Sequence, residues 1–532
     1  MSRNNSVGSD GFVSHRRAAA AGFTPGGLDP RGMSLDEFTE HLDVGLRKQH
    51  EQSTAWDFKS LVSFLDGVAK ANPHQHITGS VGNPELLRLA LQIYQEDPAS
   101  REAFLEYATT SDLMRPEIAR HFFQLSINAM VHWLQTHIPL SSTPGDFSQA
   151  DDRLNLVRLA FQSGHTGTNE LLEEAYRCVA LENQLHGVAE VWFRTTLGDH
   201  DAESFERATR SAIRGASRAE ADGGSPLNVR FVVGMRKMWQ YTASATQTGM
   251  HVDAQALGLV TMLGRLRDGD AQTAGMILGV DSVGTDTGWR PEWQAPARTM
   301  AASQGMHVAM HFGEAWRPGE LPATLLRLET LVRTGDIRQL DNSNAIFAVR
   351  DTTNPVQAYS DDEWNEIGVL QVSVFGQLIG RGIGLGINPT SNDWLTRSLR
   401  QREGWRLRHH NQPVTPGDAS VIDMMFPEGG VEPLVMVVGN DNSRIYPSRV
   451  QNSYLTVSEE LANLWEIPGS CEPSVFGKLP TRAIAQLIMN GFTLTQCVSG
   501  TGKSDDSLQQ FGPLNERGMA NAFPGPNGRV PG

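Results

Sequence analysis

The chain has 532 residues, of which 39% are hydrophobic and 20% are charged, a composition typical of a soluble globular protein. Its formal net charge of -15 argues against a nucleic-acid partner, because a phosphate backbone is bound by a basic surface. The sequence has no apolar run long enough to predict a membrane span, and its three widely spaced cysteines predict no disulfide framework. We therefore expect a cytoplasmic protein without nucleic-acid or membrane partners, and nothing in the sequence indicates its oligomeric state.

The N-terminal residues 1–33 are rich in Ser, Asn, Gly and Pro, which predicts a disordered leader. A Ser-rich leader can also be an export signal, but this one lacks the apolar segment of a secretory signal. Ser34 followed by Glu37 matches a capping box, so a helix is expected to begin there. A second helix is predicted over residues 56–69, just before the first strand.

The first predicted strand contains two histidines, His74 and His76, in the segment N-P-H-Q-H. Because side chains alternate along a strand, both imidazoles would face the same side and could bind one metal ion. The alternative is a polar turn after Pro73. Residues 84–185 that follow have helical patterns throughout, which predicts a helical insertion after this strand.

From residue 188 onward, short apolar segments alternate with helical patterns. We expect strands at 188–194, 229–234, 276–281, 306–311, 337–340, 383–387 and 434–438. Together with the His74 segment, this alternation predicts an α/β fold, a closed (β/α)8 TIM-like barrel.

The predicted barrel domain covers residues 34–480 and includes the helical insertion. Residues 345–380 form a longer connection than usual and are expected to cover the barrel mouth or extend its rim. Residues 481–532 are predicted to be a C-terminal helix and a flexible tail. The tail contains S-G-T-G-K-S (499–504), which lacks the first glycine and the preceding strand of a phosphate-binding loop.

Several predicted strands end in residues that can carry chemistry: Asp281, His311 and, just beyond the last strand, Asp441. Active-site residues of such barrels lie at the carboxyl ends of the strands, so these side chains are expected to converge. His311 and Asp441, added to the two first-strand histidines, form a set of three imidazoles and one carboxylate that suits a single Zn²⁺ with one position left for water. Glu314, three residues after His311, is placed to transfer a proton.

Six segments resemble motifs of the adenosine deaminase branch of the metal-dependent amidohydrolases. They are 74–80 (family H-x-H-L-D-G-S), 191–195 (E-x-R), 279–286 (G-x-D-L-A-G-D-E), 311–314 (H-A-G-E), 388–392 (C-P-T-S-N) and 440–442 (T-D-D). The resemblance extends over about residues 70–465. It implies hydrolytic deamination of an adenine-type nucleoside or modified purine, with hydroxide adding at C6 and ammonia leaving.

The resemblance also implies roles for individual residues. The four predicted ligands (His74, His76, His311 and Asp441) would hold one zinc ion. Glu314 would protonate purine N1, and the backbone of Gly284 would contact the N3 edge of the purine.

Three departures from the family motifs change an expected role. Asn342 stands where the family has the histidine that orients the attacking hydroxide, and an amide cannot act as a base. His409 or His410 would have to fold back to replace that histidine. Thr78 replaces a ribose-side aspartate, and Asn442 replaces a carboxyl that donates to purine N7. In addition, Asp286 replaces a glutamate of the third motif.

These departures leave two alternatives to a purine deaminase. One is a zinc-binding barrel with little turnover that binds a nucleoside-like ligand or a partner. The other is a hydrolase of a different C–N bond.

Overall fold

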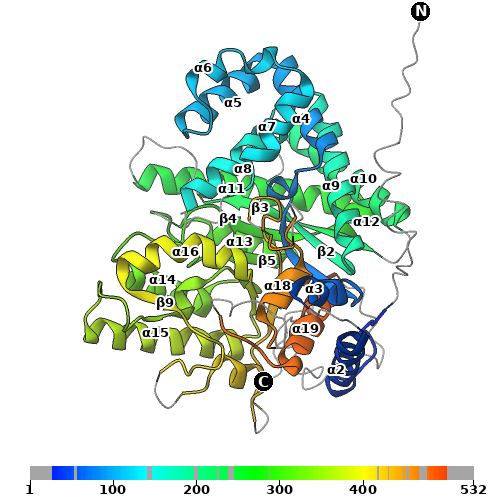
Figure 1. Cartoon of the computed structure of the whole chain (residues 1–532). Coiled ribbons are helices and arrows are strands. Elements are labelled where there is room, and N and C mark those ends of the chain that lie inside the picture. Colours follow the sequence, from blue (N-terminus) through cyan, green and yellow to red (C-terminus); the bar gives the residue numbers. More distant parts are fainter. Residues whose placement is uncertain are drawn as a thin grey trace, which may run out of the picture.

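The computed structural model describes residues 27–499, except 53–56, 141–146, 164, 197–201, 224–226, 238–244, 287, 416–417, 429–430, 447, 451–453 and 467–475. Eight parallel strands form one sheet in the order β1-β2-β3-β4-β5-β6-β8-β10. Their bounds are Lys70–His76 (β1), Val188–Thr195 (β2), Asn228–Arg236 (β3), Ile277–Val283 (β4), His307–His311 (β5), Gln339–Asp341 (β6), Gly384–Ile387 (β8) and Met436–Val438 (β10). Figure 1 shows this sheet at the centre of the molecule with helices around it.

The barrel is closed at the point where β1 meets the chain that follows β10. Gln75 forms a parallel bridge with Asp441, the His76 amide donates to the Asp441 carbonyl at 2.9 Å, and the Asp441 amide donates to the His74 carbonyl at 3.2 Å. The predicted (β/α)8 TIM-like barrel is confirmed. The turn suggested after Pro73 is wrong, because Pro73 lies inside β1.

Helices on the outside follow the strands in turn. They are α10 (Ala202–Asp222), α11 (Ala245–Gly269), α12 (Ala271–Met276), α13 (Ala295–Ser303), α14 (Leu321–Thr334), α15 (Asp361–Gly380), α16 (Pro389–Glu403), α17 (Val421–Met425) and α18 (Val457–Leu464). A small antiparallel pair, β7 (Ala348–Arg350) and β9 (Trp405–Leu407), lies outside the barrel. No helix in the described ranges has the length and apolar character needed to cross a membrane.

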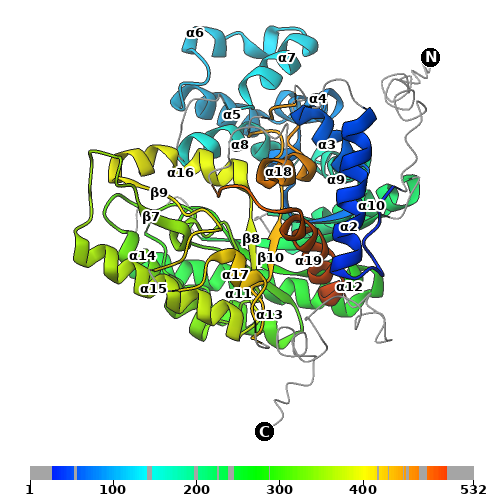
Figure 2. The same ribbon diagram turned by 60° about the horizontal axis from the view of Figure 1, so that its bottom comes forward.

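The predicted helical insertion is present between β1 and β2. It consists of α4 (Pro84–Glu96), α5 (Pro98–Thr110), α6 (Pro116–Ala119), α7 (Ile127–His137), α8 (Phe147–Phe161) and α9 (Gly167–Leu185). Helix α9 packs along α10, while α5, α6 and α7 project beyond the barrel as a lobe, seen at the top of Figure 2. Two short 3₁₀ helices also lie between β1 and β2, η1 (Thr78–Ser80) and η2 (Phe122–Gln124). A third, η3 (Asn344–Phe347), lies in the loop after β6.

At the N-terminal end, α2 (Leu35–Gln52) packs against the last helix, α19 (Thr481–Ser499), and α3 (Phe58–Asp66) packs against α18. The predicted disordered leader extends too far into the chain. Within residues 27–33, Leu28 bridges Val68, and its carbonyl accepts from the Ala69 amide at 2.8 Å. Here Gly and Pro serve a tight turn, and Gly32 has φ +90°. Residues 1–26 and 500–532, with the predicted tail and most of its S-G-T-G-K-S segment, lie outside the described residues.

The prediction that residues 345–380 cover the barrel mouth is wrong, because none of them lines the cavity at the carboxyl ends of the strands. Most of the segment is α15, which packs beside α14 in the outer layer. Its buried residues include Ile367, Val374 and Phe375, all fully covered. These apolar side chains need a hydrophobic partner surface, which the barrel wall provides and a solvated rim does not.

Inside the barrel, a small apolar layer lies below a layer of polar side chains, because side chains alternate along each strand. Trp192 of β2 and Ala309 of β5 belong to a buried cluster inside the barrel. Two residues further along the same strands come Arg194 and His311, both at most 3% exposed. Side chains two apart face the same side of a strand, so the polar residues continue the inward-facing rows towards the carboxyl ends.

Candidate active site and metal centre

Three imidazoles converge at the carboxyl end of the barrel. The Nε2 atoms of His74 and His76 are 3.2 Å apart, those of His76 and His311 are 3.3 Å apart, and those of His311 and His74 are 3.1 Å apart. The first pair comes from alternate positions at the end of β1, and the third imidazole ends β5. These side chains form one of the groups in the described chain that could hold a metal ion.

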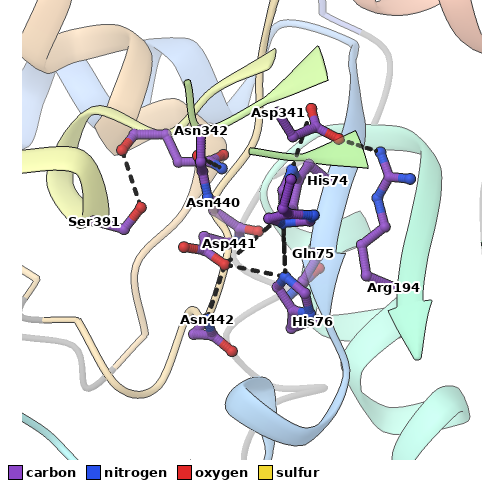
Figure 3. Close-up of polar contacts among 12 residues, drawn as sticks. His74, Gln75, His76, Arg194, Asp341, Asn342, Ser391, Asn440, Asp441 and Asn442 are labelled. Atoms are coloured by element: carbon purple, nitrogen blue, oxygen red, sulfur yellow. Dashed lines mark hydrogen bonds and ion pairs between the residues drawn. The ribbon is translucent and has the colours of Figure 1, made fainter. Parts of the chain in front are cut away.

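Asp441 adds a carboxylate to this group. Its Oδ1 lies 3.5 Å from His76 Nε2 and 3.8 Å from His74 Nε2. Figure 3 shows Asp441 beside these two imidazoles. Asn442 Nδ2 donates to the same oxygen at 2.8 Å. Asp441 has φ +49°, a left-handed conformation that Asp tolerates better than most residues. The bridge to Gln75 thus brings the two ends of the barrel together at the site.

The far side of two of the imidazoles is held by carboxylates. His311 Nδ1 lies 3.0 Å from Asp281 Oδ1, and His74 Nδ1 lies 3.4 Å from Asp341 Oδ1. Arg194 lies between the two carboxylates, with Nη2 2.9 Å from Asp341 Oδ2 and Nη1 3.6 Å from Asp281 Oδ2. A proton on each Nδ1 leaves the Nε2 lone pairs directed at the centre of the three Nε2 atoms, which we call the shared point.

This donor set fits a zinc ion. Two nitrogens bound to zinc at tetrahedral angles are roughly 3.3–3.4 Å apart, and the three Nε2 separations are within about 0.3 Å of that value. At least two of the three Nε2 atoms direct a lone pair inward, so hydrogen bonds among them cannot give each nitrogen a partner. One cation at the centre can accept all three lone pairs. Imidazole and carboxylate are also the ligands that zinc commonly takes.

Burial and charge act in opposite directions on the pKa values of this group. Burial lowers the pKa of His311, but Asp281 and the other nearby carboxylates outweigh it and raise the pKa to about 9, so a metal ion must displace a proton there. For Asp341, burial raises the pKa, but Arg194 and His74 hold it well below its usual range. Burial and the neighbouring imidazoles lower the pKa of His76.

Glu314 is positioned by a carboxylate of the preceding loop. Asp286 Oδ2 accepts from the backbone amides of Gly313 and Glu314 at 2.9 and 3.2 Å, and its Oδ1 pairs with Lys237 Nζ at 2.6 Å. Gly313 has φ +78°, which few other residues adopt. The buried Lys237–Asp286 pair therefore holds the backbone that carries Glu314. Asp286, which replaces the glutamate of the family motif, fixes the position of this backbone.

The environment of the Glu314 carboxyl group favours its protonated form at neutral pH. Burial, together with Asp441 and Asp286, raises the pKa of Glu314 to about 8, although His311 and Lys237 lower it. Asn342 Nδ2 donates to Glu314 Oε1 at 3.0 Å, which leaves Oε2 for the proton. A carboxyl that is mostly protonated at neutral pH can act as a general acid.

Asn342 belongs to a cluster of amides. The side-chain amides of Asn388 and Asn392 lie 2.7 and 3.3 Å from Asn342 Oδ1. Asn342 has φ +54°, a conformation in which Asn and His are enriched. Neither candidate replacement base enters this cluster: His410 contacts the Phe476 carbonyl at 3.0 Å, and His409 packs against Gly477.

A cavity of about 740 Å³ opens beside these groups. Most of the predicted site residues line it, namely His76, Thr78, Gly284, His311, Glu314, Asp441 and Asn442. His74 and Asn342 lie behind its wall, each about 1% exposed. Helix α8 of the insertion contributes Asp151, Asn155 and Arg158, so the insertion forms part of the mouth.

Sequence reasoning missed several residues of the site. Asp341 was overlooked because it lies in a short strand with weak β character, next to the more conspicuous Asn342. Arg236, which lines the cavity, ends β3, and Lys237 follows it directly; position at a strand end was the signal that could have identified them. Arg158 lines the cavity only because the insertion folds over the barrel, which no local pattern indicates.

No protein-family model matches the chain, and no curated protein matches it. Similar solved structures include a zinc-bound amidohydrolase from Burkholderia ambifaria, with 13% identity and a TM-score of 0.48 over 84% of this chain and 90% of that one. Others are the apo N6-methyl-AMP deaminase from Arabidopsis thaliana (13%, TM-score 0.44, 84% and 96%) and an adenine deaminase from Arthrobacter aurescens (13%, TM-score 0.45, 84% and 97%). These structural neighbours are adenosine deaminase-like amidohydrolases, and at this similarity the function has to be argued from the site itself.

Proposed function

We propose that the chain is a zinc-dependent hydrolytic deaminase of an adenine-type nucleoside or a modified purine relative. One observation carries the proposal. A set of three imidazoles and one carboxylate that suits a single Zn²⁺ shares a cavity with Glu314, a buried carboxyl whose pKa is raised to about 8. Metal ligands beside a neutral carboxylic acid are the groups needed to add water to an amino-substituted aromatic carbon and to protonate the adjacent ring nitrogen.

His74, His76, His311 and Asp441 would hold the zinc ion, which would supply a polarised water as the nucleophile. Glu314 does the proton work from Oε2, since Oε1 accepts from Asn342. As hydroxide adds at purine C6, Glu314 gives its proton to N1. The Glu314 carboxylate then takes the proton of the C6 hydroxyl and passes it to the amino group, so that the C6 carbonyl forms and the C6–N bond breaks with release of ammonia. A proton from the next water returns Glu314 to its protonated form.

The cavity also offers groups to hold the ring. Gly284, Asn442 and Thr78 line it. We assign the backbone of Gly284 to the N3 edge of the purine, Asn442 to N7 and Thr78 to the sugar side. A volume of about 740 Å³ is within the range of small-molecule sites and admits a nucleoside-sized ligand. Thr78 carries no charge, so substituents on the sugar are compatible with this wall.

Ammonia release from zinc-loaded protein tests the proposal. Adenine, adenosine, AMP and their N6-methyl derivatives should be incubated with high protein concentrations, following the aminopurine absorbance and the ammonia formed. We expect turnover with at least one of them and none with the His74→Ala variant, which should also lose zinc in metal analysis. Zinc-bound protein that releases no ammonia from any of these compounds would rule out the proposed activity.

Asn342 favours a second candidate, a zinc-binding barrel that binds a nucleoside-like ligand with little turnover. The amide beside Glu314 supplies no general base, which typically contributes about 10²- to 10⁴-fold in rate. Purine-dependent stabilisation of the zinc protein in thermal unfolding, without ammonia release, would support this candidate. Release of ammonia from a compound that is not a purine would instead identify a hydrolase of another C–N bond.

A further inference from the structure

Beneath the proposed metal ligands lies a fully buried cluster of three charged residues, Arg194, Asp281 and Asp341. Each is at most 1% exposed. They come from three strands, β2, β4 and β6, and the guanidinium lies between the two carboxylates, 2.9 Å from Asp341 and 3.6 Å from Asp281. Arg194 Nη2 also donates to the Pro73 carbonyl at 3.2 Å, so the cluster contacts β1 next to His74.

Asp341 uses both of its oxygens in this cluster. Its Oδ1 accepts from Gln339 Nε2 at 2.8 Å and lies 3.4 Å from His74 Nδ1, while Oδ2 accepts from Arg194. Space for the carboxylate is provided by the neighbouring strand: a Cβ on Gly386 would lie 1.9 Å from Asp341 Oδ1. The sequence of β8 is therefore matched to a carboxylate at this position.

The cluster contacts the proposed ligands only on the side away from the shared point. Asp341 faces the Nδ1 of His74, and Asp281 faces the Nδ1 of His311 at 2.9–3.0 Å. Figure 3 shows Arg194, Asp341 and His74 in this succession. A carboxylate at Nδ1 holds the proton there and directs the lone pair of Nε2 towards a metal ion.

The formal charges also agree with a divalent cation. One guanidinium against the three buried carboxylates of Asp281, Asp341 and Asp441 leaves -2 around the converging imidazoles. A buried excess of negative charge is costly without a partner, and a divalent ion neutralises it.

We propose that Asp341, bridged to Asp281 by Arg194, is a positioning residue that presents His74 and His311 to the metal ion through Nε2. The inference rests on the metal site of the proposed function and goes beyond it by assigning these three residues a task in metal affinity. An ion cluster that served only the stability of the barrel would leave metal affinity unchanged.

Zinc affinity, measured by competition with a chromogenic chelator on the full chain, tests this role. Asp341→Asn keeps the shape of the side chain but places an amide against Arg194. We expect zinc to bind 10- to 100-fold more weakly, the range typical of losing a group that supports a metal ligand. Asp281→Asn should have a similar effect through His311, and Arg194→Lys should weaken binding because an ammonium cannot bridge both carboxylates.

Glu403→Gln is the matched control. Glu403 is also a buried carboxylate with several donors, including Tyr359 Oη at 2.9 Å and Trp405 Nε1 at 3.0 Å, but it lies outside the cavity lining. We expect this variant to bind zinc as the wild type does, even if its unfolding temperature falls. Zinc affinity of Asp341→Asn within twofold of the wild type would overturn the inference.

A second measurement applies to the wild-type protein and needs no variant to fold. In ¹⁵N spectra of the zinc-loaded chain with labelled histidine, His74 and His311 should carry Nδ1 protons that exchange slowly with water. Coordination through Nδ1 of either residue, or failure of the wild type to bind zinc, would overturn the inference. Tight zinc binding without deamination would refute the proposed activity and leave the positioning role of Asp341 intact.

Discussion

The two halves of the site are built from different chemistry. On the metal side, His74 and His311 are backed by Asp341 and Asp281, with Arg194 between the carboxylates. On the proton side, the carboxyl group of Glu314 is held by an amide, Asn342, which contacts further amides. Charged partners fix which nitrogen faces the metal, whereas Oε1 of Glu314 contacts an amide, which neither takes up nor releases a proton. The proton side should therefore be the side on which one substitution can lower or raise turnover without loss of the metal ion.

Among substitutions that leave the metal ligands intact, the largest effect is expected from Glu314→Gln. If Glu314 carries the proton to the ring nitrogen, its loss should lower kcat by about 10²- to 10⁴-fold. Zinc content should stay at the wild-type level, because Glu314 is no part of the ligand set. A variant that keeps full turnover would show that the proton side works without Glu314, and the comparison between the halves would fail.

A smaller effect, in the opposite direction, is expected from Asn342→His. An imidazole there could act as a base, and the left-handed backbone at φ +54° accommodates His. We expect turnover to rise by up to about 10²-fold, with zinc affinity unchanged. As a control, Asn342→Ala should lower turnover, since Glu314 Oε1 loses its donor. An Asn342→His enzyme no faster than the wild type would show that a missing base does not limit the rate.

The pH dependence of turnover should report on the same carboxyl group. Glu314 acts in its protonated form, and its pKa is raised to about 8, first of all by burial. We expect kcat/KM to fall as pH rises above about 8, by up to tenfold per pH unit once the group is ionised. A profile that stays level to pH 9.5 would mean that Glu314 is not the proton donor.

The smallest effect concerns a buried carboxyl outside the cavity. Burial raises the pKa of Glu460 to about 8, and it accepts from the Thr390 backbone amide at 3.1 Å. Between its unfolded pKa near 4.5 and about 8, the folded state binds more protons, so the free energy of unfolding should fall as pH rises.

Glu460→Gln should make this decline less steep, which urea unfolding at pH 6 and pH 8 would measure. Turnover should stay close to the wild type, because Glu460 does not line the cavity. A large loss of turnover in this variant would show that Glu460, and not only Glu314, is needed for the reaction.

The sequence by itself determined the elements with regular patterns. Alternating strands and helices from residue 188 onward predicted the barrel, because hydrophobic periodicity depends only on neighbours along the chain. The spacing of His74 and His76 predicted a shared face of β1 for the same reason. His311 and Asp441 were expected nearby because the carboxyl ends of barrel strands meet at one edge.

Only the tertiary structure decided which groups support these side chains. Asp341 contacts His74 across 267 positions of the chain, and Arg194 joins Asp341 to Asp281 only because β2, β4 and β6 face one interior. The contact between Asn342 and Glu314, and the place of α15 in the outer layer, likewise depend on how separate elements pack. Local patterns carry no record of such partners, because they are set by strand pairing, register and the shape of the closed barrel.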